Sequence, residues 1–352
     1  MTPTRRRLLF SAIAVLGALL LLELGARAVQ LVAPRLFVVA PNQEGIGPGV
    51  SLEPDPELLF RSRPGTSRSE QIQVEVNDLG MRGGVVPPPG VAPRVMFLGD
   101  SSVFGWGVPR DEAFPWATGR RLGRDGQPVV TLNAGTPGYS SAQSRFQLEK
   151  LGKTLAPDVV VIASLWSDMM RTGWRDRELF ERFGSPAHAQ ALRRQETLAS
   201  SALFVLLRAR VLSLRPVPEN QFVLWDTVIG GKDGAGATRA TAADHRANLE
   251  AMADTAESLG ARPIFLILPA NRLGEHPPDE VLLPYQDNHR EVAAARGALC
   301  VDMDTRWREH GDATLSRWFM DRVHPSAEGH ADIADALAPV LAQTLGERAA
   351  DR

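Results

Sequence analysis

Three side chains far apart in the 352-residue sequence have the types needed for nucleophilic catalysis. Ser101 follows Gly99 and Asp100, and Asp321 precedes His324 in a segment just ahead of a predicted helix. A serine hydroxyl is a poor nucleophile at neutral pH and needs a positioned base, which histidine supplies because its pKa lies near the working pH. A carboxylate beside the histidine fixes its tautomer. These residues are therefore a candidate Ser-His-Asp set.

The element that must position Ser101 is the apolar run at residues 95–98. Four apolar residues that end in Gly-Asp-Ser are too few for a normal helix, and they indicate a buried parallel strand that ends in a tight turn. Reactive groups collect beyond the carboxyl ends of such strands. Taken alone, the same motif is also typical of a helix cap.

From Arg94 onward, short apolar runs alternate with amphipathic segments. This alternation predicts an α/β fold with a parallel five-stranded sheet and helices on both faces. Strands are expected near residues 95–98, 129–132, 159–163, 263–268 and 299–302, and helices near 111–122, 141–151, 242–259 and 326–345.

A long insertion, about residues 171–239, separates the third strand from the fourth. It contains an expected helical stretch at 191–214 and a Gly-rich loop at 230–236. Connections of this length are often lids or partner surfaces. We expect its apolar run at 202–207 to pack on the core, with a substrate channel or a membrane as alternatives.

The amino terminus carries an export signal. Arg5 to Arg7 precede a charge-free apolar run from Leu8 to Leu22, and Glu23 follows. Such a run covers roughly 22 Å as a helix, and tilt or Glu23 reaching the interface can close the gap to about 30 Å. The basic cluster should stay cytoplasmic. An uncleaved signal-anchor is favoured, and a Sec signal cut after Ala28 or a twin-arginine signal are the alternatives.

The composition of the sequence indicates the domain boundaries and the expected partners. Residues 1–28 are the anchor or signal peptide, 29–93 a Pro- and Gly-rich tether with a small β-rich lead-in, and 94–346 the main domain. A net charge of −2 without a basic excess gives no reason to expect a nucleic-acid partner. The single cysteine, Cys300, and the scattered histidines show no metal-ligand spacing, so no cofactor or metal is expected.

Four short blocks in this order resemble those of the SGNH (GDSL) hydrolase family, including its membrane-tethered bacterial members. They are Gly99-Asp100-Ser101, Gly138, Trp166-Ser167-Asp168 and Asp321-x-x-His324. The resemblance implies a three-layer flavodoxin-like α/β/α sandwich and an ester hydrolase or acyltransferase. It implies Ser101 as nucleophile, His324 as base and Asp321 as its orienter, with the N–H groups of Ser101 and Gly138 in an oxyanion hole. The Gly-x-Ser-x-Gly elbow of the α/β-hydrolases is absent.

Ser167 is a departure from the family's pattern. The family has an asparagine there, whose side-chain amide is the third oxyanion donor. Losing one such donor typically costs about 2.7–4 kcal/mol in the transition state. A serine hydroxyl can donate with a shorter reach, and the alternative is that Ser167 only caps its turn.

Other residues near the blocks have less specific roles. Asp100 and Asp168 are expected to brace their turns through backbone N–H groups, and Trp106 and Trp166 either shape a pocket or pack in the core. The remaining histidines have no motif around them and are expected on the solvated surface: His188, His245, His276, His289, His310 and His330.

The sequence therefore favours an exported serine esterase acting on an acyl ester or acylated glycan. It is expected in the inner membrane, with a cytoplasmic N-terminus and a periplasmic catalytic domain, or secreted if the signal is cleaved. One alternative function is an O-acyltransferase for an envelope or secreted polysaccharide. The other is a catalytically degenerate module that binds a glycan or a protein.

Overall fold

The computed structural model of the chain describes residues 2–33, 36, 52–68, 72–123, 128–172, 174–213, 237–273 and 279–350. The chain forms two compact units. The larger unit comprises residues 45–185 and 224–352, and the smaller one comprises residues 1–44 and 186–223.

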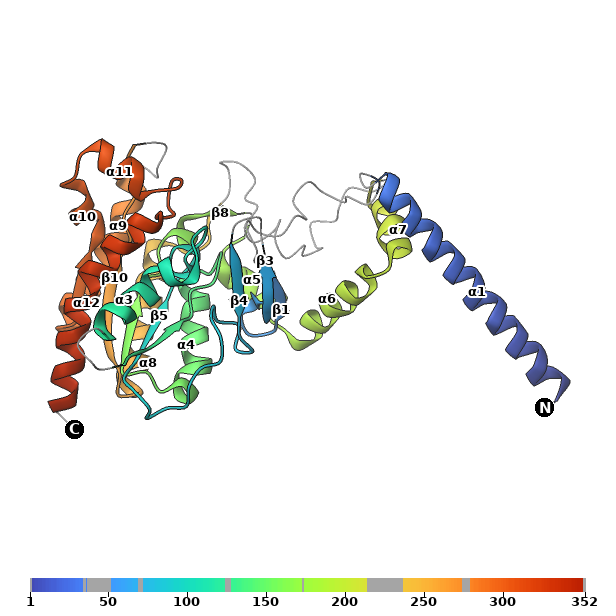
Figure 1. Cartoon of the computed structure of the whole chain (residues 1–352), viewed down its shortest axis with the longest axis horizontal. Helices are drawn as coiled ribbons and strands as arrows, with labels where there is room; N and C mark the ends of the chain where they lie inside the picture. Colours follow the sequence, from blue (N-terminus) through green and yellow to red (C-terminus); the bar gives the residue numbers. More distant parts are fainter. Residues whose placement is uncertain are drawn as a thin grey trace. The chain divides into compact units, whose positions relative to one another are not determined.

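The larger unit is built on a parallel sheet that has five strands in the described part of the chain (Figure 1). The strand order is β11-β10-β7-β5-β6, which confirms the predicted α/β class with a five-stranded parallel sheet. The strands are β5 (Arg94–Leu98), β6 (Val130–Asn133), β7 (Val159–Ile162), β10 (Arg262–Ile267) and β11 (Leu299–Asp302).

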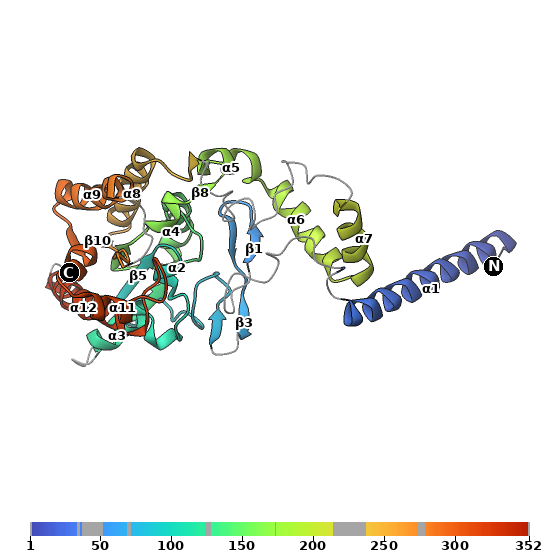
Figure 2. The same cartoon turned by 90° about the horizontal axis from the view of Figure 1, so that it is seen from above.

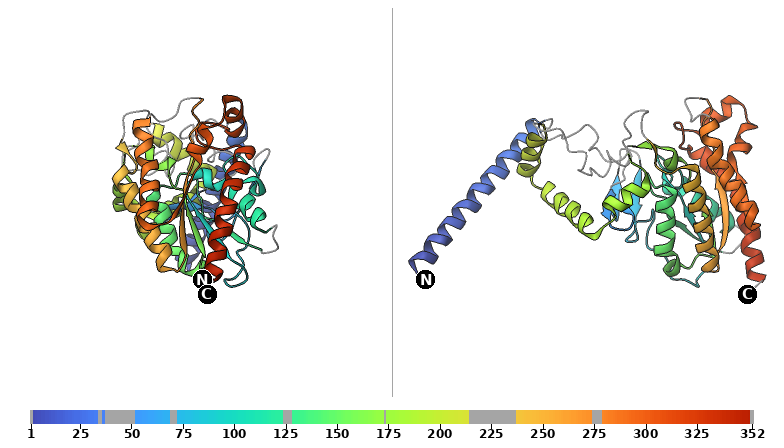
Figure 3. Two further views of the ribbon diagram at one scale, coloured as in Figure 1. Left: turned by 90° about the vertical axis from the view of Figure 1, so that its left-hand side faces the viewer. Right: turned by 180° about the vertical axis from the view of Figure 1, so that it is seen from behind.

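Both faces of this sheet are covered, which is why its central strands are apolar throughout. Val95 and Phe97 of β5 pack in one hydrophobic cluster, and Met96 and Leu98 pack in the other. Figures 2 and 3 show the helices on the two opposite faces, which gives the predicted three layers. One face carries α3 (Phe114–Leu122) and α12 (Ala327–Ala350), and the other α4 (Ser141–Leu155), α8 (Ala242–Ser258) and α9 (Asp279–Arg296).

The helix expected from residue 111 is divided in two. A 3₁₀ turn, η2 (Arg110–Glu112), comes first, and α3 begins at Phe114 after the extended residue Ala113. Pro115 stands in the first turn of α3, where its missing N–H costs nothing. Two short helices, α10 (Met303–Arg308) and α11 (Asp312–Trp318), precede the loop that carries His324.

The lead-in forms two antiparallel hairpins that pack on the sheet unit. They are β1 (Leu52–Asp55) with β2 (Leu59–Ser62), and β3 (Gly65–Arg68) with β4 (Gln73–Val76). The Tyr139 hydroxyl donates to the carbonyl oxygen of Phe60 at 2.8 Å. Isolated bridges join Val76 to Arg82 and Arg82 to Asn133 of β6. The lead-in is therefore continuous with the edge of the main sheet.

The two ends of the insertion pair as short antiparallel strands, β8 (Arg171–Thr172) and β9 (Ala237–Thr238). The helix α5 (Asp176–Phe183) follows β8. The expected helical stretch is found as α6 (Pro186–Ala199) and α7 (Ala202–Ser213), while the Gly-rich loop at 230–236 lies outside the described residues.

The smaller unit contains α1 (Pro3–Val32) together with α6 and α7. Within the described residues, α1 is the one helix long and apolar enough to cross a membrane, a criterion that signal sequences also meet. Within this unit, four residues of the run 202–207 pack against Ala26 and Val29 of α1: Ala202, Leu203, Val205 and Leu206.

Candidate active site

Ser101 begins the one-turn helix α2 (Ser101–Phe104), directly after the carboxyl end of β5. Gly99 makes this turn possible, because its φ is +157° and a Cβ there would lie 2.4 Å from the Val103 side chain and 3.1 Å from the Ala163 carbonyl oxygen. Any side chain at this position would separate the ends of two neighbouring strands. The turn thus carries the Ser101 hydroxyl to the carboxyl edge of the sheet.

The structure brings Ser101, His324 and Asp321 into one chain of hydrogen bonds. The Ser101 Oγ lies 2.7 Å from His324 Nε2, and His324 Nδ1 lies 2.6 Å from Asp321 Oδ2. The side chains of His324 and Asp321 retain 16% and 49% of their exposure, so the pair lies at the surface edge of the site. Residues more than two hundred positions apart in the sequence therefore meet at one strand end.

The ionisation state of Asp321 determines which ring nitrogen of His324 carries a proton. Burial alone would raise the pKa of Asp321, but hydrogen bonds from the His324 ring and from the N–H groups of Val323 and His324 outweigh it and lower the pKa to about 2. An ionised carboxylate only accepts hydrogen bonds, so Nδ1 of His324 carries the proton. Nε2 is then free to accept the Ser101 hydroxyl proton, which is the tautomer a general base needs.

The two tryptophans expected near the site have different environments. Trp106 is half-buried and stacks on the His324 ring, with ring centroids 5.7 Å apart and planes 21° apart. Trp166 is buried in a hydrophobic cluster of the sheet. Trp106 thus offers an aromatic wall beside the candidate base, whereas Trp166 packs in the core.

Asp100 ties the nucleophile turn to the loop after β7. One carboxylate oxygen accepts the N–H of Ser102 at 3.0 Å, and the other accepts those of Trp166 at 3.0 Å and Ser167 at 3.3 Å. The carboxylate is fully buried, and burial raises its pKa. Asp168 braces α4 in the same way, because it accepts the N–H of Ser141 at 2.7 Å. Both aspartates therefore have the bracing contacts expected from the sequence.

Gly138 and Ser167 stand on the two loops that flank the nucleophile turn. The Thr136 N–H donates to the Gly99 carbonyl at 3.1 Å, which fixes the loop before Gly138 against the end of β5. Ser167 lies in η4 (Trp166–Met169), whose N–H groups are held by Asp100 as described. The N–H of Ser167 donates to Asp100, and the residue is buried.

Part of this chain matches the model of a known family. The pattern of the GDSL-like Lipase/Acylhydrolase family matches residues 173–331, just under half of the chain, and this segment includes Asp321 and His324. Over this segment, the chain is similar to the GDSL-like lipase/acylhydrolase family. No curated protein matches the chain.

Three solved structures of esterases are similar to this chain at low identity. A lipase/acylhydrolase from Enterococcus faecalis is 16% identical, with a TM-score of 0.45 over 71% of this chain and 96% of that one. An acetyl-xylooligosaccharide esterase from Geobacillus is 16% identical, with 0.44 over 74% and 97%. The esterase from a Pseudoalteromonas species is 13% identical, with 0.42 over 72% and 98%.

Arg239 is a residue of the candidate site that the sequence analysis missed. Its fully buried side chain pairs with Asp176 at 2.8 Å and donates to the Gly138 carbonyl oxygen and to Gln143 Oε1. The neck of the insertion is therefore bonded directly to the loop that carries Gly138. A lone arginine beside a Gly-rich stretch gives no sequence signal for such a role.

Arg82 is a second missed residue, on the opposite side of the nucleophile turn. Its guanidinium donates to the carbonyl oxygens of Phe104 at 2.7 Å, Gly105 at 2.6 Å and Val108 at 2.7 Å. Burial lowers the pKa of Arg82 to about 10, which still leaves it charged at neutral pH. The segment that follows Ser101 is thus held by one arginine of the lead-in.

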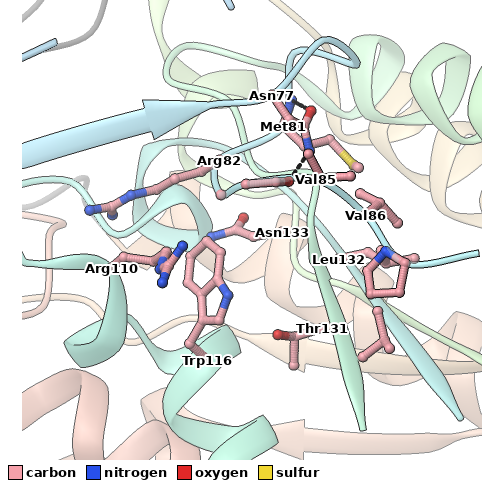
Figure 4. A pocket seen from close by; sticks show the side chains of 14 residues that line it. Asn77, Met81, Arg82, Val85, Val86, Arg110, Trp116, Thr131, Leu132 and Asn133 are labelled. Carbon is pink, nitrogen blue, oxygen red and sulfur yellow. Dashed lines mark hydrogen bonds between the residues drawn. The ribbon is translucent and has the colours of Figure 1, made fainter. Parts of the chain in front are cut away.

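Behind this segment lies a cavity of about 250 Å³ that the catalytic candidates do not line. Figure 4 shows Trp116 and Thr131 facing it, while the Arg82 guanidinium points away. Its walls come from the lead-in, α3 and β6. The cavity is therefore separate from the Ser101 hydroxyl.

Three histidines expected at the surface are buried. His245, His289 and His330 are fully buried, and burial lowers their pKa values to about 4, 3 and 3. They fill interhelical space that the amphipathic pattern did not reveal, whereas His310 is exposed as expected and His276 lies outside the described residues. Among the described residues, no group of three His, Cys, Asp or Glu side chains could hold a metal ion.

Proposed function

We propose that this protein is an exported serine esterase that uses Ser101, His324 and Asp321 as its catalytic residues. The observation that carries the proposal is the hydrogen-bond chain of 2.7 Å and 2.6 Å that joins them at the carboxyl edge of the sheet. The family match supplies the reaction class, hydrolysis of an ester. The 2.7 Å contact between Ser101 and His324 argues against the degenerate binding module, because it is the contact a serine needs for activation.

The reaction proceeds in two halves. Ser101 Oγ attacks the ester carbonyl carbon while His324 Nε2 takes its proton, and the resulting imidazolium is stabilised by Asp321. His324 then gives that proton to the leaving alcohol, which produces an acyl-enzyme. Water attacks the acyl carbon with His324 again acting as base, and the acid product leaves with Ser101 restored.

The developing oxyanion would be bound by the N–H groups of Ser101 and Gly138. The third donor of the family would be replaced by the Ser167 hydroxyl, whose N–H is already committed to Asp100. A weaker third donor predicts a slower enzyme than family members that have asparagine.

The anchor is the second part of this proposal. With Arg5 to Arg7 on the cytoplasmic side, α1 would cross the inner membrane and place the catalytic unit in the periplasm. Its apolar window has a mean hydropathy of 2.3 and no buried residues. A reporter enzyme that works only outside the cytoplasm should show activity when it is fused to the C-terminus. Activity of a reporter that works only in the cytoplasm would contradict export.

An O-acyltransferase remains a candidate because of Trp106. Its half-buried ring stacked on His324 offers the flat apolar surface that sugar rings pack against, right beside the candidate base. A glycan hydroxyl placed there could replace water in the second half-reaction. Faster acyl transfer to an added glycan than to water would favour this function over hydrolysis.

The decisive experiment is to label the full-length protein in membranes with a fluorophosphonate. Mass spectrometry would locate the modified peptide, with Ser101→Ala and His324→Ala as matched variants. We expect labelling at Ser101 that drops by a factor of about a thousand or more in His324→Ala, since the serine loses its base. A folded wild-type protein that is not labelled at Ser101 would overturn the proposed mechanism and favour the binding module.

A further inference from the structure

The smaller unit contains a polar contact that explains why a charged residue stands in the membrane helix. The Glu23 carboxylate accepts hydrogen bonds from the Ser201 hydroxyl at 2.7 Å and from the N–H groups of Ala202 and Leu203 at 3.0 Å each. These N–H groups belong to the first turn of α7, which has no partner for them within the helix. Glu23 of α1 therefore caps α7, although the two are far apart in the sequence.

Arg27 completes this contact one helical turn later. Its Nε lies 2.9 Å from Glu23, and its guanidinium donates to the carbonyl oxygen of Ser200 at 3.0 Å. A carboxylate at a helix N-terminus is favoured by the helix dipole, and the arginine compensates its charge. Both charged groups in this half of α1 are thus bound to the segment that starts α7.

Small residues allow the two helices to approach closely. Ala26 of α1 and Ala202 of α7 are each only 4% exposed and are buried against one another's helix. Val29 of α1 and three apolar residues of α7 complete the contact: Leu203, Val205 and Leu206. Contacts between small side chains are typical of helix packing in a bilayer, where large apolar side chains gain nothing by leaving lipid.

The apolar surface of this pair continues past Glu23. Leu24 and Leu31 on α1 are 54% and 86% exposed, and Leu207 on α7 is 56% exposed. From Leu8 to Val32 the helix is long enough to span a bilayer of about 30 Å, which the run that ends at Leu22 is not. Because α7 binds the two charges, this longer surface can face lipid without exposing an unpaired carboxylate.

We propose that α7 lies in the outer leaflet beside α1, so that the insertion supplies a second membrane contact. The occupant of the exposed face is the lipid of the bilayer that α1 crosses, because that face is continuous with the lipid-facing surface of α1. This inference rests on the proposed anchoring by α1. A second copy of the chain is the competing occupant.

The test uses the full-length chain reconstituted in phosphatidylethanolamine–phosphatidylglycerol vesicles. In a Cys300→Ala background, single cysteines replace Leu16, Leu207 or Ala349, and each carries an environment-sensitive fluorophore. We expect nitroxide-labelled lipids to quench the probes at 16 and 207 severalfold and to leave the probe at 349, at the exposed carboxyl end of α12, unchanged. Leu16 lies in the apolar run of α1 and serves as the anchor control.

The outcomes separate the two proposals. Quenching at 16 without quenching at 207 would overturn the α7 contact and leave the anchor standing. No quenching at 16 would overturn the anchor itself. If the probe at 207 is protected from the quencher, and this protection disappears when the protein is diluted in lipid, the face binds a second copy of the chain. That result would overturn the lipid contact.

The role of Glu23 is tested by thiol cross-linking between Ala26→Cys and Ala202→Cys in the same membranes. We expect efficient cross-linking, a severalfold loss when Glu23→Leu is added, and substantial recovery with Glu23→Gln, whose amide oxygen can still accept. Ala26→Cys paired with Ala187→Cys, at the start of α6, is the matched control. Unchanged cross-linking in Glu23→Leu would show that the cap does not hold the helices together.

Discussion

The candidate site is held from two sides by buried arginines that come from different regions of the chain. Arg82 belongs to the lead-in, and its hydrogen bonds among the described residues go to main-chain carbonyl oxygens after Ser101. Arg239 belongs to the neck of the insertion, and it has a buried carboxylate partner, Asp176, in addition to the Gly138 carbonyl. One arginine is therefore bound by neutral dipoles, and the other by an ion pair.

This difference determines which buried groups lose a partner when each arginine is replaced. Without Arg82, the carbonyl oxygens of Phe104 and Gly105 keep weaker donors, the Asn133 amide and the Val108 N–H, at 3.3 Å each. The Val108 carbonyl loses the Arg82 donor, which costs roughly 1–3 kcal/mol for a buried group that water cannot reach. Without Arg239, a buried Asp176 carboxylate loses its counter-charge, a larger penalty. Both regions lie outside the strand-end loops, so the geometry of those loops depends on segments that are not part of the catalytic motif.

The largest effect is expected for Arg239→Met. An unpaired buried carboxylate typically costs about 3–5 kcal/mol, so we expect the free energy of unfolding to fall by that amount. The measurement is urea unfolding of the full-length chain in detergent, with kcat measured in parallel. Activity should fall as well, because the Gly138 loop loses its donor.

A double variant separates charge from packing at this position. Asp176→Asn combined with Arg239→Met removes both partners, and we expect it to regain most of the lost stability. Activity should recover less, since the Gly138 carbonyl stays without its donor. If the double variant is as unstable as Arg239→Met alone, the ion pair is not what makes Arg239 important.

A smaller stability loss with a selective kinetic effect is expected for Arg82→Met. Loss of charge-assisted hydrogen bonds to the segment after Ser101 should cost about 2 kcal/mol and lower kcat about tenfold with little change in KM. Arg82→Lys should rescue only part, because an ammonium lacks the planar fork that reaches several carbonyls. Equal losses in kcat and in binding would instead indicate a general loss of structure.

The sequence predicted the strand-end loops well because each depends on a local pattern. The buried runs at β5 and β7, the glycine before Asp100 and the short spacing between Asp321 and His324 are all contiguous signals. Main-chain topology then brings parallel strand ends together without any further information. This explains why Ser101 and His324 could be paired before the fold was known.

The supporting residues could not be predicted because their roles depend on long-range packing. Arg82 and Arg239 stand in segments without hydrophobic periodicity, where arginine is normally solvated. His330 lies on a helix whose apolar pattern does not show that its ring stacks on Phe114. The contact of Glu23 with α7 likewise joins residues whose sequence spacing carries no signal.

Ser167, on the loop after β7, provides a further test of the candidate site. If its hydroxyl is a weak oxyanion donor, Ser167→Asn should raise kcat by about tenfold, since a longer amide restores the missing donor. Ser167→Ala should lower kcat by a similar factor. Steady-state kinetics on a short-chain ester would measure both, and unchanged rates in both variants would mean that Ser167 only caps its turn.

The smallest effect on stability is expected for His330, a residue whose pKa is influenced by the charge of Arg82. Burial, then the charges of Arg82 and His324, lower the pKa of His330 to about 3. The unfolded chain protonates this histidine near pH 6.5 while the folded chain does not, so its contribution to stability is lost as pH falls below about 6.5. We expect the wild type to lose about 1 kcal/mol more than His330→Asn between pH 6 and pH 5. Urea unfolding at the two pH values measures this, and an equal loss in both proteins would mean that His330 is not kept neutral by its burial.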